Sequence, residues 1–306
     1  MTQTVFIDGA AGTTGLEIAE RLAGRSEFSL VALDEARRKD ADARREALND
    51  ADFVILCLPD AAAIEAVGMI GNARTKVIDA STAHRVAPGW VYGFPELNAG
   101  QRAAIAASAR VSNPGCYPTG FLALVAPLVA AGILPRDARL SVNAVSGYSG
   151  GGKELIARFE AETAIGFRAY GLSLGHKHVP EMQRGADLAH PPLFAPAVVP
   201  VYRGMIVEVP LAFDAPTADA AFDALAAHYD GSPLVGVRRA EGESELLLRK
   251  DDPATDAMEL IVYADAAGRQ LRLVARLDNL GKGASGACVQ NLNIMAGLPE
   301  TAGLRL

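Results

Sequence analysis

Near its start the chain reads Val5-Phe6-Ile7-Asp8-Gly9-Ala10-Ala11-Gly12-Thr13-Thr14-Gly15, and a helical pattern follows with Leu16, Ala19 and Leu22 on one face. A strand, a glycine-rich turn and a helix in this order begin a nucleotide-binding βα unit. The glycine spacing GxxGxxG is a variant of the dinucleotide fingerprint, in which the backbone approaches a pyrophosphate at the helix N-terminus. A ligand-free turn has the same pattern. We assign cofactor binding to Gly9, Gly12, Thr13, Thr14 and Gly15.

Short apolar runs, such as 53–58 and 76–79, alternate with helical patterns in the first third of the chain. This alternation is typical of a parallel sheet covered on both faces. From Leu140 onward, strand patterns at 198–201, 205–209 and 271–277 have few helices between them, and the last alternates apolar residues with arginines. Such alternation favours a half-solvated, mostly antiparallel sheet.

We therefore predict an α/β protein with two domains. Residues 1–113, completed by 281–306, form a Rossmann-type dinucleotide-binding domain. Residues 114–280 form an α+β domain for catalysis and oligomerisation. A chain of 306 residues, half of them hydrophobic, is long enough for two cores.

Composition and charge restrict the classes of binding partner and the cellular compartment that we expect. The net charge of −7 disfavours nucleic-acid binding. The longest apolar run, 121–134, is too short to cross a bilayer, which takes roughly 20 residues, and no basic leader with a cleavage site is visible. Three scattered cysteines form no disulfide framework. We expect a cytoplasmic protein with no membrane or nucleic-acid partner.

One cysteine stands where a helix is predicted to begin, in Asn113-Pro114-Gly115-Cys116-Tyr117-Pro118-Thr119-Gly120. Helix amides favour a thiolate at this position, and Pro118 suits the first turn because its missing N–H is not needed there. A buried cysteine packed at a domain seam is the alternative. Cys116 is the candidate nucleophile.

A catalytic thiol needs an acid or base partner, and His176-Lys177-His178-Val179-Pro180-Glu181 is the only place where two of the five histidines cluster. On an extended segment His176 and His178 would share a face. A metal site is a rival interpretation, but no third ligand is well placed, and a pair of structural histidines is another. We predict no metal.

Three further segments have the residue types that hold anions. Asp34 lies where an acid binds the ribose of NAD, yet Arg37 and Arg38 follow and suit the 2′-phosphate of NADP. Arg85, after Ser81, offers a bidentate fork to a phosphate or carboxylate. Tyr148 and Ser149 lie in a small-residue loop whose amides suit an anion. Solvated loops, a surface ion pair and a flexible connector are the alternatives.

The chain resembles the N-acetyl-γ-glutamyl-phosphate reductases of arginine biosynthesis, in their shorter form, nearly end to end. The resemblance rests on the glycine turn and on five further motifs: Asp79-Ala80-Ser81-Thr82-Ala83-His84-Arg85, Tyr92-Gly93-Phe94-Pro95-Glu96-Leu97, Ser112-Asn113-Pro114-Gly115-Cys116-Tyr117-Pro118-Thr119, His176-Lys177-His178-Val179-Pro180-Glu181 and Asp278-Asn279-Leu280-Gly281-Lys282-Gly283-Ala284-Ser285-Gly286. The cysteine motif is the most specific of these.

The resemblance implies reduction of an acyl phosphate by NADPH through a Cys116 thioester, in a homo-oligomer whose second domain is like that of glyceraldehyde-3-phosphate dehydrogenase. His176 would be the acid or base, with His178 as second choice, and Asn113 would lie near the oxyanion. The resemblance also implies substrate contacts by Ser81, Arg85, Tyr148, Ser149 and Glu181. Cofactor contacts would come from Asn279, Lys282 and Gly283.

Three rival functions share features of this pattern. Aspartate-semialdehyde dehydrogenase has the same reaction type and domain plan, but the cysteine and histidine motifs fit the reductase better. An N-acetylaminoadipyl-phosphate reductase acts on a substrate that is one methylene longer. In an apolar pocket one methylene changes the binding free energy by only about 1–3 kcal/mol. A dinucleotide-binding sensor without turnover would need neither motif.

Overall fold

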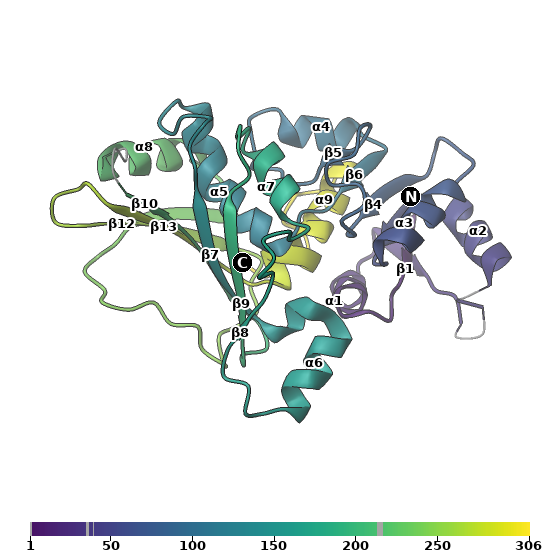
Figure 1. Ribbon diagram of the computed structural model, residues 1–306. Coiled ribbons are helices and arrows are strands. Elements are labelled where there is room, and N and C mark those ends of the chain that lie inside the picture. The colour runs from purple at the N-terminus through teal and green to yellow at the C-terminus, as the bar shows by residue number, and fades with distance from the viewer. Residues whose placement is uncertain (1, 35–36, 39, 213–216) are drawn as a thin grey trace. The chain divides into compact units, whose positions relative to one another are not determined.

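The computed structural model describes residues 2–34, 37–38, 40–212 and 217–306. The chain divides into two compact units, each described here by itself (Figure 1). The first comprises Met1–Pro95, Gly100–Pro114 and Ala284–Leu304, and the second comprises Glu96–Ala99, Gly115–Gly283 and Arg305–Leu306. The predicted domain boundaries at 113/114 and 280/281 stay a prediction.

A six-stranded sheet of order β2-β1-β3-β4-β6-β5 organises the first unit, and all of its strand pairs are parallel. Its strands are β1 Gln3–Asp8, β2 Phe28–Val31, β3 Phe53–Leu56, β4 Lys76–Asp79, β5 Val91–Tyr92 and β6 Arg110–Ser112. The predicted parallel sheet is confirmed.

Apolar side chains cover both faces of this sheet, because neighbouring residues of a strand point to opposite sides. Val5 and Ile7 of β1 join one core cluster together with Val289 and Leu292, while Phe6 joins a second cluster with Leu48. The helices of the unit are α1 Thr13–Leu22, α2 Ala41–Asp50, α3 Asp60–Gly68, α4 Gln101–Ala107 and α9 Gly286–Ala296. The C-terminal helix α9 is thus part of the first unit's core.

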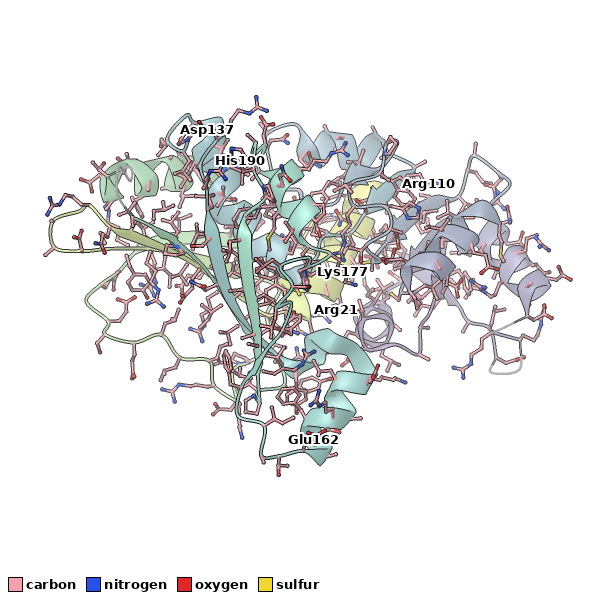
Figure 2. All side chains as sticks on the ribbon, viewed as in Figure 1. Arg21, Arg110, Asp137, Glu162, Lys177 and His190 are labelled. Carbon is pink, nitrogen blue, oxygen red and sulfur yellow. The ribbon has the colours of Figure 1, made fainter. Side chains whose placement is uncertain are left out.

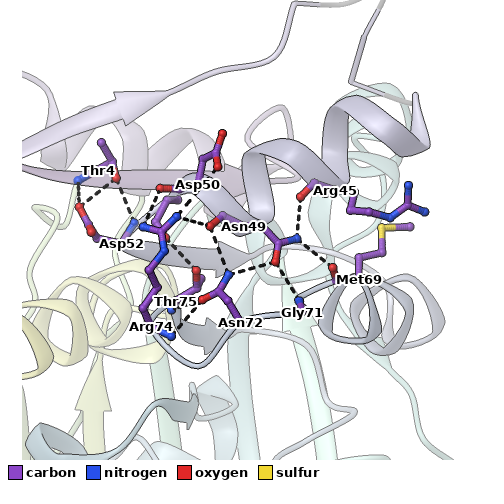
Figure 3. Close-up of polar contacts among 11 residues, drawn as sticks. Thr4, Arg45, Asn49, Asp50, Asp52, Met69, Gly71, Asn72, Arg74 and Thr75 are labelled. Atoms are coloured by element: carbon purple, nitrogen blue, oxygen red, sulfur yellow. Dashed lines mark hydrogen bonds and ion pairs between the residues drawn. The ribbon is translucent and has the colours of Figure 1, made fainter.

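Polar contacts hold the amino ends of β3 and β4 in place (Figure 3). The Asn49 amide at the end of α2 donates to the carbonyl of Met69 at 2.9 Å, and its oxygen accepts the N–H of Gly71 at 2.8 Å. Asp52, just before β3, accepts the N–H of Thr4 in β1 at 2.8 Å. These bonds lie at the edge opposite the strand ends where ligands of parallel α/β sheets bind.

The second unit has a seven-stranded mixed sheet of order β11-β12-β13-β10-β7-β9-β8. Only the β7–β9 and β11–β12 pairs are parallel, so the predicted mostly antiparallel sheet is confirmed. The strands are β7 Ser141–Gly147, β8 Arg168–Ala169, β9 Leu193–Val199, β10 Met205–Leu211, β11 Val235–Arg239, β12 Met258–Ala264 and β13 Leu271–Leu277. In β13, Leu271, Leu273, Ala275 and Leu277 are buried, as the alternation predicts. On the opposite face Arg272 is exposed and Arg276 half-buried, but Val274 is buried, so this face is solvated only in part.

Helix α5, Cys116–Ala130, is the central helix of the second unit and lies against β10 and β13. Its side chains from Tyr117 to Val129 are all buried. Gly120 permits the close packing, because a Cβ there would lie 2.8 Å from Val207 Cγ2. The other helices are α6 Gly152–Ala161, α7 Val179–Gly185 and α8 Ala218–His228, with short helical turns at Tyr148–Gly151 and Gly281–Ser285. Among the described residues, no helix has the length and apolar character that a bilayer crossing requires.

Candidate active site

The first residue of α5 is Cys116, where the sequence predicts the helix to begin, and Gly115 is its N-cap. The Gly115 carbonyl accepts both the N–H and the hydroxyl of Thr119 at 2.9 Å, which fixes the first turn. Gly283 lies against the cysteine, because a Cβ at position 283 would lie 2.9 Å from the Cβ of Cys116. A glycine here leaves room beside the thiol.

Both predicted histidines lie in the same unit as the nucleophile and contact its neighbour in the chain. Their ring centroids are 4.7 Å apart, and that of Tyr117 lies 6.4 Å from His176 and 5.9 Å from His178. His178 is the N-cap of α7, and its backbone N–H donates to Nδ1 of His176 at 3.1 Å. The pair therefore sits in a turn and not on an extended segment.

Burial, and secondarily the charge of Lys177, lower the pKa of His176 below its ordinary value. Figure 2 marks Lys177 on the segment that leads into α7. Because Nδ1 accepts a hydrogen bond, the neutral imidazole carries its proton on Nε2. His176 is thus neutral near pH 7, and its Nε2–H can donate a hydrogen bond.

Tyr170 is a site residue that sequence reasoning missed. Its ring meets that of His176 edge to face at 5.5 Å. Burial, with a smaller contribution from the nearby Cys116, raises its pKa to about 12. Burial also holds the pKa of Tyr117 well above its ordinary range. Both phenols therefore stay protonated beside the cysteine, but no motif spacing marks Tyr170.

Glu181, predicted to bind substrate, lies in the first turn of α7 and is only 2% exposed. Its Oε1 accepts the backbone N–H of Gly115 at 2.8 Å. The carboxyl group thus connects the histidine segment with the residue before the nucleophile.

Asn279 ties together two loops of the second unit. Its oxygen accepts the N–H of Gly204 at 2.9 Å, and its amide donates to Ser149 Oγ at 2.9 Å. The ring of Tyr148 stacks on Phe159 with centroids 5.3 Å apart. The structure thus places the predicted residues Tyr148, Ser149 and Asn279 in one packed region, while their contacts with substrate and cofactor stay predictions.

Two cations near the 278–283 segment form ion pairs, one buried and one partly buried. Lys282 Nζ lies 2.7 Å from Glu96, and both side chains are 1% exposed. Arg203, which sequence reasoning missed, donates to Asp278 at 3.0 Å, and the carbonyl of Asp278 accepts the N–H of Gly283 at 3.0 Å. The Lys282 ammonium is thus bound to a carboxylate, and its predicted cofactor contact stays a prediction.

In the first unit, the glycine turn joins β1 to α1 and needs its glycines. Gly9 has φ +89°, and a Cβ there would lie 2.3 Å from the carbonyl oxygen of Cys57. A Cβ at Gly15 would lie 2.6 Å from the carbonyl oxygen of Gly9. Gly12 is the N-cap of α1, so Thr13 and Thr14 begin the helix. The turn leaves backbone close to any ligand bound there.

The loop after β2 explains the mixed signal of Asp34 and the two arginines. Asp34 Oδ1 accepts the N–H of Arg37 at 2.8 Å, and its carbonyl accepts the N–H of Arg38 at 2.9 Å. The Asp34 carboxylate thus stabilises the turn that holds Arg37 and Arg38. Sequence reasoning missed Arg44 of α2, which donates to Asp8 at 2.9 Å at the carboxyl end of β1.

Around β4, the predicted anion-binding residues are held by buried bonds. Asp79 accepts Ser81 Oγ at 2.7 Å and lies 2.6 Å from His84 Nδ1. The Arg85 guanidinium donates to the carbonyls of Ala80 and Asn113 at 3.1 and 3.0 Å. These bonds orient Arg85, and they give His84 a structural part that the sequence does not indicate.

The predicted oxyanion residue Asn113 is 1% exposed. Its amide donates to the carbonyl of Ala284 at 3.0 Å, and its oxygen accepts the Asn291 amide at 3.1 Å. Over residues 2–34, 37–38, 40–212 and 217–306, no three His, Cys, Asp or Glu side chains are grouped to hold a metal ion.

Comparison with known proteins matches both halves of the chain. The model of the semialdehyde dehydrogenase NAD binding domain matches residues 4–106, and that of the semialdehyde dehydrogenase dimerisation domain matches 116–279. N-acetyl-gamma-glutamyl-phosphate reductase from Trichormus variabilis is 50% identical over 98% of each chain. The chain belongs to the N-acetyl-gamma-glutamyl-phosphate reductase family. The predicted family is confirmed.

Other members of the reductase family agree. The enzyme from Sinorhizobium fredii is 48% identical over 96% of this chain and 99% of its own, and that from Burkholderia lata is 49% identical over 98% of each. Among solved structures, aspartate semialdehyde dehydrogenase II from Vibrio cholerae has a TM-score of 0.75 at 18% identity, covering 97% of this chain and 99% of its own. The enzyme from Francisella tularensis has a TM-score of 0.71 at 14% identity, covering 96% and 100%. These likenesses confirm the predicted fold.

Proposed function

We propose that the protein reduces N-acetyl-glutamyl 5-phosphate to N-acetyl-glutamate 5-semialdehyde and phosphate with NADPH, as a step of arginine biosynthesis. The observation that carries the proposal is Cys116 at the N-terminus of α5, with His176 and His178 beside its neighbour Tyr117. Family membership supports the same reaction, since the relatives at about 50% identity are named for it.

In the proposed reaction the Cys116 sulfur attacks the acyl carbon. The carbon–sulfur bond forms, the carbon–oxygen bond to phosphorus breaks, and phosphate leaves with the bonding electrons. After hydride has been added to the thioester carbon, the Nε2–H of His176 donates a hydrogen bond to the thiohemiacetal oxyanion. The oxyanion then forms the aldehyde carbonyl as the carbon–sulfur bond breaks, and the sulfur leaves as the Cys116 thiolate.

The chain's residues fit a dinucleotide. Positions 9 and 15 leave no room for a Cβ, as expected of the tight turn and the close helix packing in a dinucleotide-binding βα unit. Gly9, Gly12, Thr13, Thr14 and Gly15 would hold the pyrophosphate, and Arg37 and Arg38 the 2′-phosphate. We also assign Asn279, Lys282 and Gly283 to the cofactor. NADPH supplies the hydride when bound.

Electrostatic groups complete the proposal. The Cys116 backbone N–H, with Asn113, would stabilise the oxyanion. Arg85, oriented by two carbonyls, would bind the phosphate with Ser81. Tyr148 and Ser149 would contact the substrate, and His178 would support His176.

The test is the reverse reaction. With N-acetylglutamate semialdehyde, phosphate and NADP, we expect the pure protein to form NADPH, and Cys116→Ala to abolish this while still binding cofactor. Cys288→Ala is the matched control, because burial raises the pKa of that thiol well above its ordinary value and makes it unreactive. Full activity of Cys116→Ala would falsify the thioester mechanism.

The same assay identifies the substrate. N-acetylaminoadipyl and unacetylated aspartyl semialdehydes are run in parallel with the N-acetylglutamyl compound. We expect the highest kcat/KM for the N-acetylglutamyl semialdehyde. A higher value for either of the others would assign the protein to the corresponding rival reaction.

We also propose that the protein works as a homo-oligomer in the cytoplasm. The second unit, which matches a dimerisation domain, exposes Phe167, Leu172 and Leu174 by 61, 80 and 59%. Large apolar side chains exposed to this extent are typical of an association surface, and we assign them to contact with a second copy of the chain. The reducing cytoplasm keeps the Cys116 thiol available for the reaction.

A further inference from the structure

Glu181 holds the peptide that precedes the nucleophile. Its side chain is 2% exposed, and its Oε1 accepts a hydrogen bond from the backbone N–H of Gly115 at 2.8 Å. Gly115 is the N-cap of α5, and Cys116 follows as the first helical residue. A buried acceptor is therefore joined to the residue before the reactive sulfur.

Hydrogen bonds hold both the N–H and the carbonyl of Gly115, the residue before Cys116. The N–H of Gly115 is bound by Glu181, and the Gly115 carbonyl is bound by the N–H and hydroxyl of Thr119, each at 2.9 Å. The Gly115 carbonyl and the Cys116 N–H belong to one planar trans peptide, so they point in opposite directions. Fixing Gly115 thus aims the Cys116 N–H outward from the helix.

The same short helix joins this support to the histidines. His178 is the N-cap of α7, Glu181 lies in its first turn, and the N–H of Met182 donates to the His178 carbonyl at 3.0 Å. His178 in turn donates its N–H to His176. One hydrogen-bonded segment therefore positions both His176 and the residue next to the nucleophile.

We propose that Glu181 is a positioning residue that aligns the Cys116 N–H with the developing oxyanion and sets the distance between the thiol and His176. This inference rests on the proposed function and gives Glu181 a part other than substrate binding. The part depends on the acceptor oxygen and not on the charge, since it is Oε1 that receives the Gly115 N–H.

Two neutral variants separate the acceptor from the charge. Glu181→Gln keeps an oxygen that accepts the Gly115 N–H, whereas Glu181→Met fills similar space without such an acceptor. In the reverse assay we expect Glu181→Met to lose roughly ten- to a hundredfold in kcat, because misplacing a reacting group by about 1 Å costs up to 10². KM for the semialdehyde should change little, and Glu181→Gln should recover most of the rate. The matched control is Glu154→Met, an exposed glutamate in the first turn of α6.

Three results in this assay would overturn the inference. Wild-type kcat in Glu181→Met would show that the contact is dispensable. Equal loss in both variants would show that the charge, not the acceptor, matters. A rise in KM at constant kcat would make Glu181 a substrate ligand. Melting temperatures identify a variant that does not fold, and Glu181→Ala then takes the place of Glu181→Met.

Alkylation of Cys116 by iodoacetamide tests the inference without turnover. Both variants lack the charge, so a difference between them reports only the lost hydrogen bond. We expect slower alkylation in Glu181→Met than in Glu181→Gln, and equal rates would contradict the inference. Should the wild type form no NADPH with any of the three semialdehydes, the proposed function fails, whereas the alkylation comparison still decides the part of Glu181.

Discussion

His176 has one nitrogen committed within the protein, since Nδ1 accepts the His178 N–H at 3.1 Å. Burial and then Lys177 lower its pKa. Only the neutral imidazole accepts the His178 N–H at Nδ1 and keeps its Nε2–H for the oxyanion, so we expect the acid limb of kcat/KM in the reverse assay to lie below the ordinary histidine value of about 6.5. Removing the neighbouring cation by Lys177→Gln should move this limb to higher pH, and Lys250→Gln should not.

The lowered pKa of His176 also makes the stability of the fold depend on pH. A histidine whose folded-state pKa lies below its unfolded value binds its proton first in the unfolded chain. Its contribution to stability is therefore complete above about pH 6.5 and is lost as the pH falls through the folded pKa. An NMR titration of His176 checks the direction, and a midpoint above 6.5 would contradict it.

Arg37 and Arg38 decide the cofactor in our proposal, because Asp34 is engaged with the backbone of the turn that holds them. We expect Arg37→Ala combined with Arg38→Ala to lower kcat/KM for NADP by roughly ten- to a hundredfold, since a hydrogen bond to a charged group contributes about 1.5–3 kcal/mol. The value for NAD should hardly change. Equal specificity constants for NADP and NAD in the wild type would contradict the NADP assignment.

At the scale of elements, α5 contains a proline, and a residue just after α8 supplies the hydrogen bond that this proline cannot make. Pro127 has no N–H, so it makes no intrahelical bond to the carbonyl of Ala123, four residues earlier. The Tyr229 hydroxyl, just after α8, donates to that carbonyl at 2.9 Å. Burial holds the pKa of Tyr229 well above its ordinary range, so the donor persists.

We therefore expect Tyr229→Phe to lower the free energy of unfolding by about 1–3 kcal/mol, the cost of leaving a buried carbonyl unsatisfied. Urea denaturation measures this loss. Tyr202→Phe is the control, because Tyr202 is 38% exposed. Equal stability of Tyr229→Phe and the wild type would show that the carbonyl finds another donor.

The helices and strands also show which features of the site can be predicted from the sequence and which cannot. The helix start at Cys116 and the alternation of β13 depend on local pattern, so the sequence predicts both. Arg203 and Arg44 carry no local signal, because their contacts are with residues distant in the sequence. Tyr170 lies near His176 in the chain, but no motif spacing predicts their contact. The part of Glu181 is likewise hidden, since its partner Gly115 lies 66 positions away.

For the whole molecule, the exposed apolar residues of the second unit predict self-association. We expect Leu172→Asp, at a side chain 80% exposed, to reduce the particle mass measured by light scattering. Ile64→Asp is the matched control, since Ile64 is 57% exposed but lies in the first unit, outside the segment that matches the dimerisation domain. An unchanged mass in Leu172→Asp, or a monomeric wild type, would contradict the assignment.

Local patterns were enough to predict the parallel sheet and the mixed second sheet, because glycine turns, helix starts and strand alternation depend on neighbours in the chain. Sequence motifs indicated the family, and the part of Cys116 as nucleophile stays a prediction. Tertiary structure decided the rest. It placed His176 in a turn where a hydrogen bond selects the tautomer of the ring. It also bound the Asp34 carboxylate to the backbone N–H of Arg37 and paired Lys282 with Glu96. It also joined Glu181 to Gly115. Buried polar groups take partners according to where the chain folds, and that placement is not a property of any local pattern.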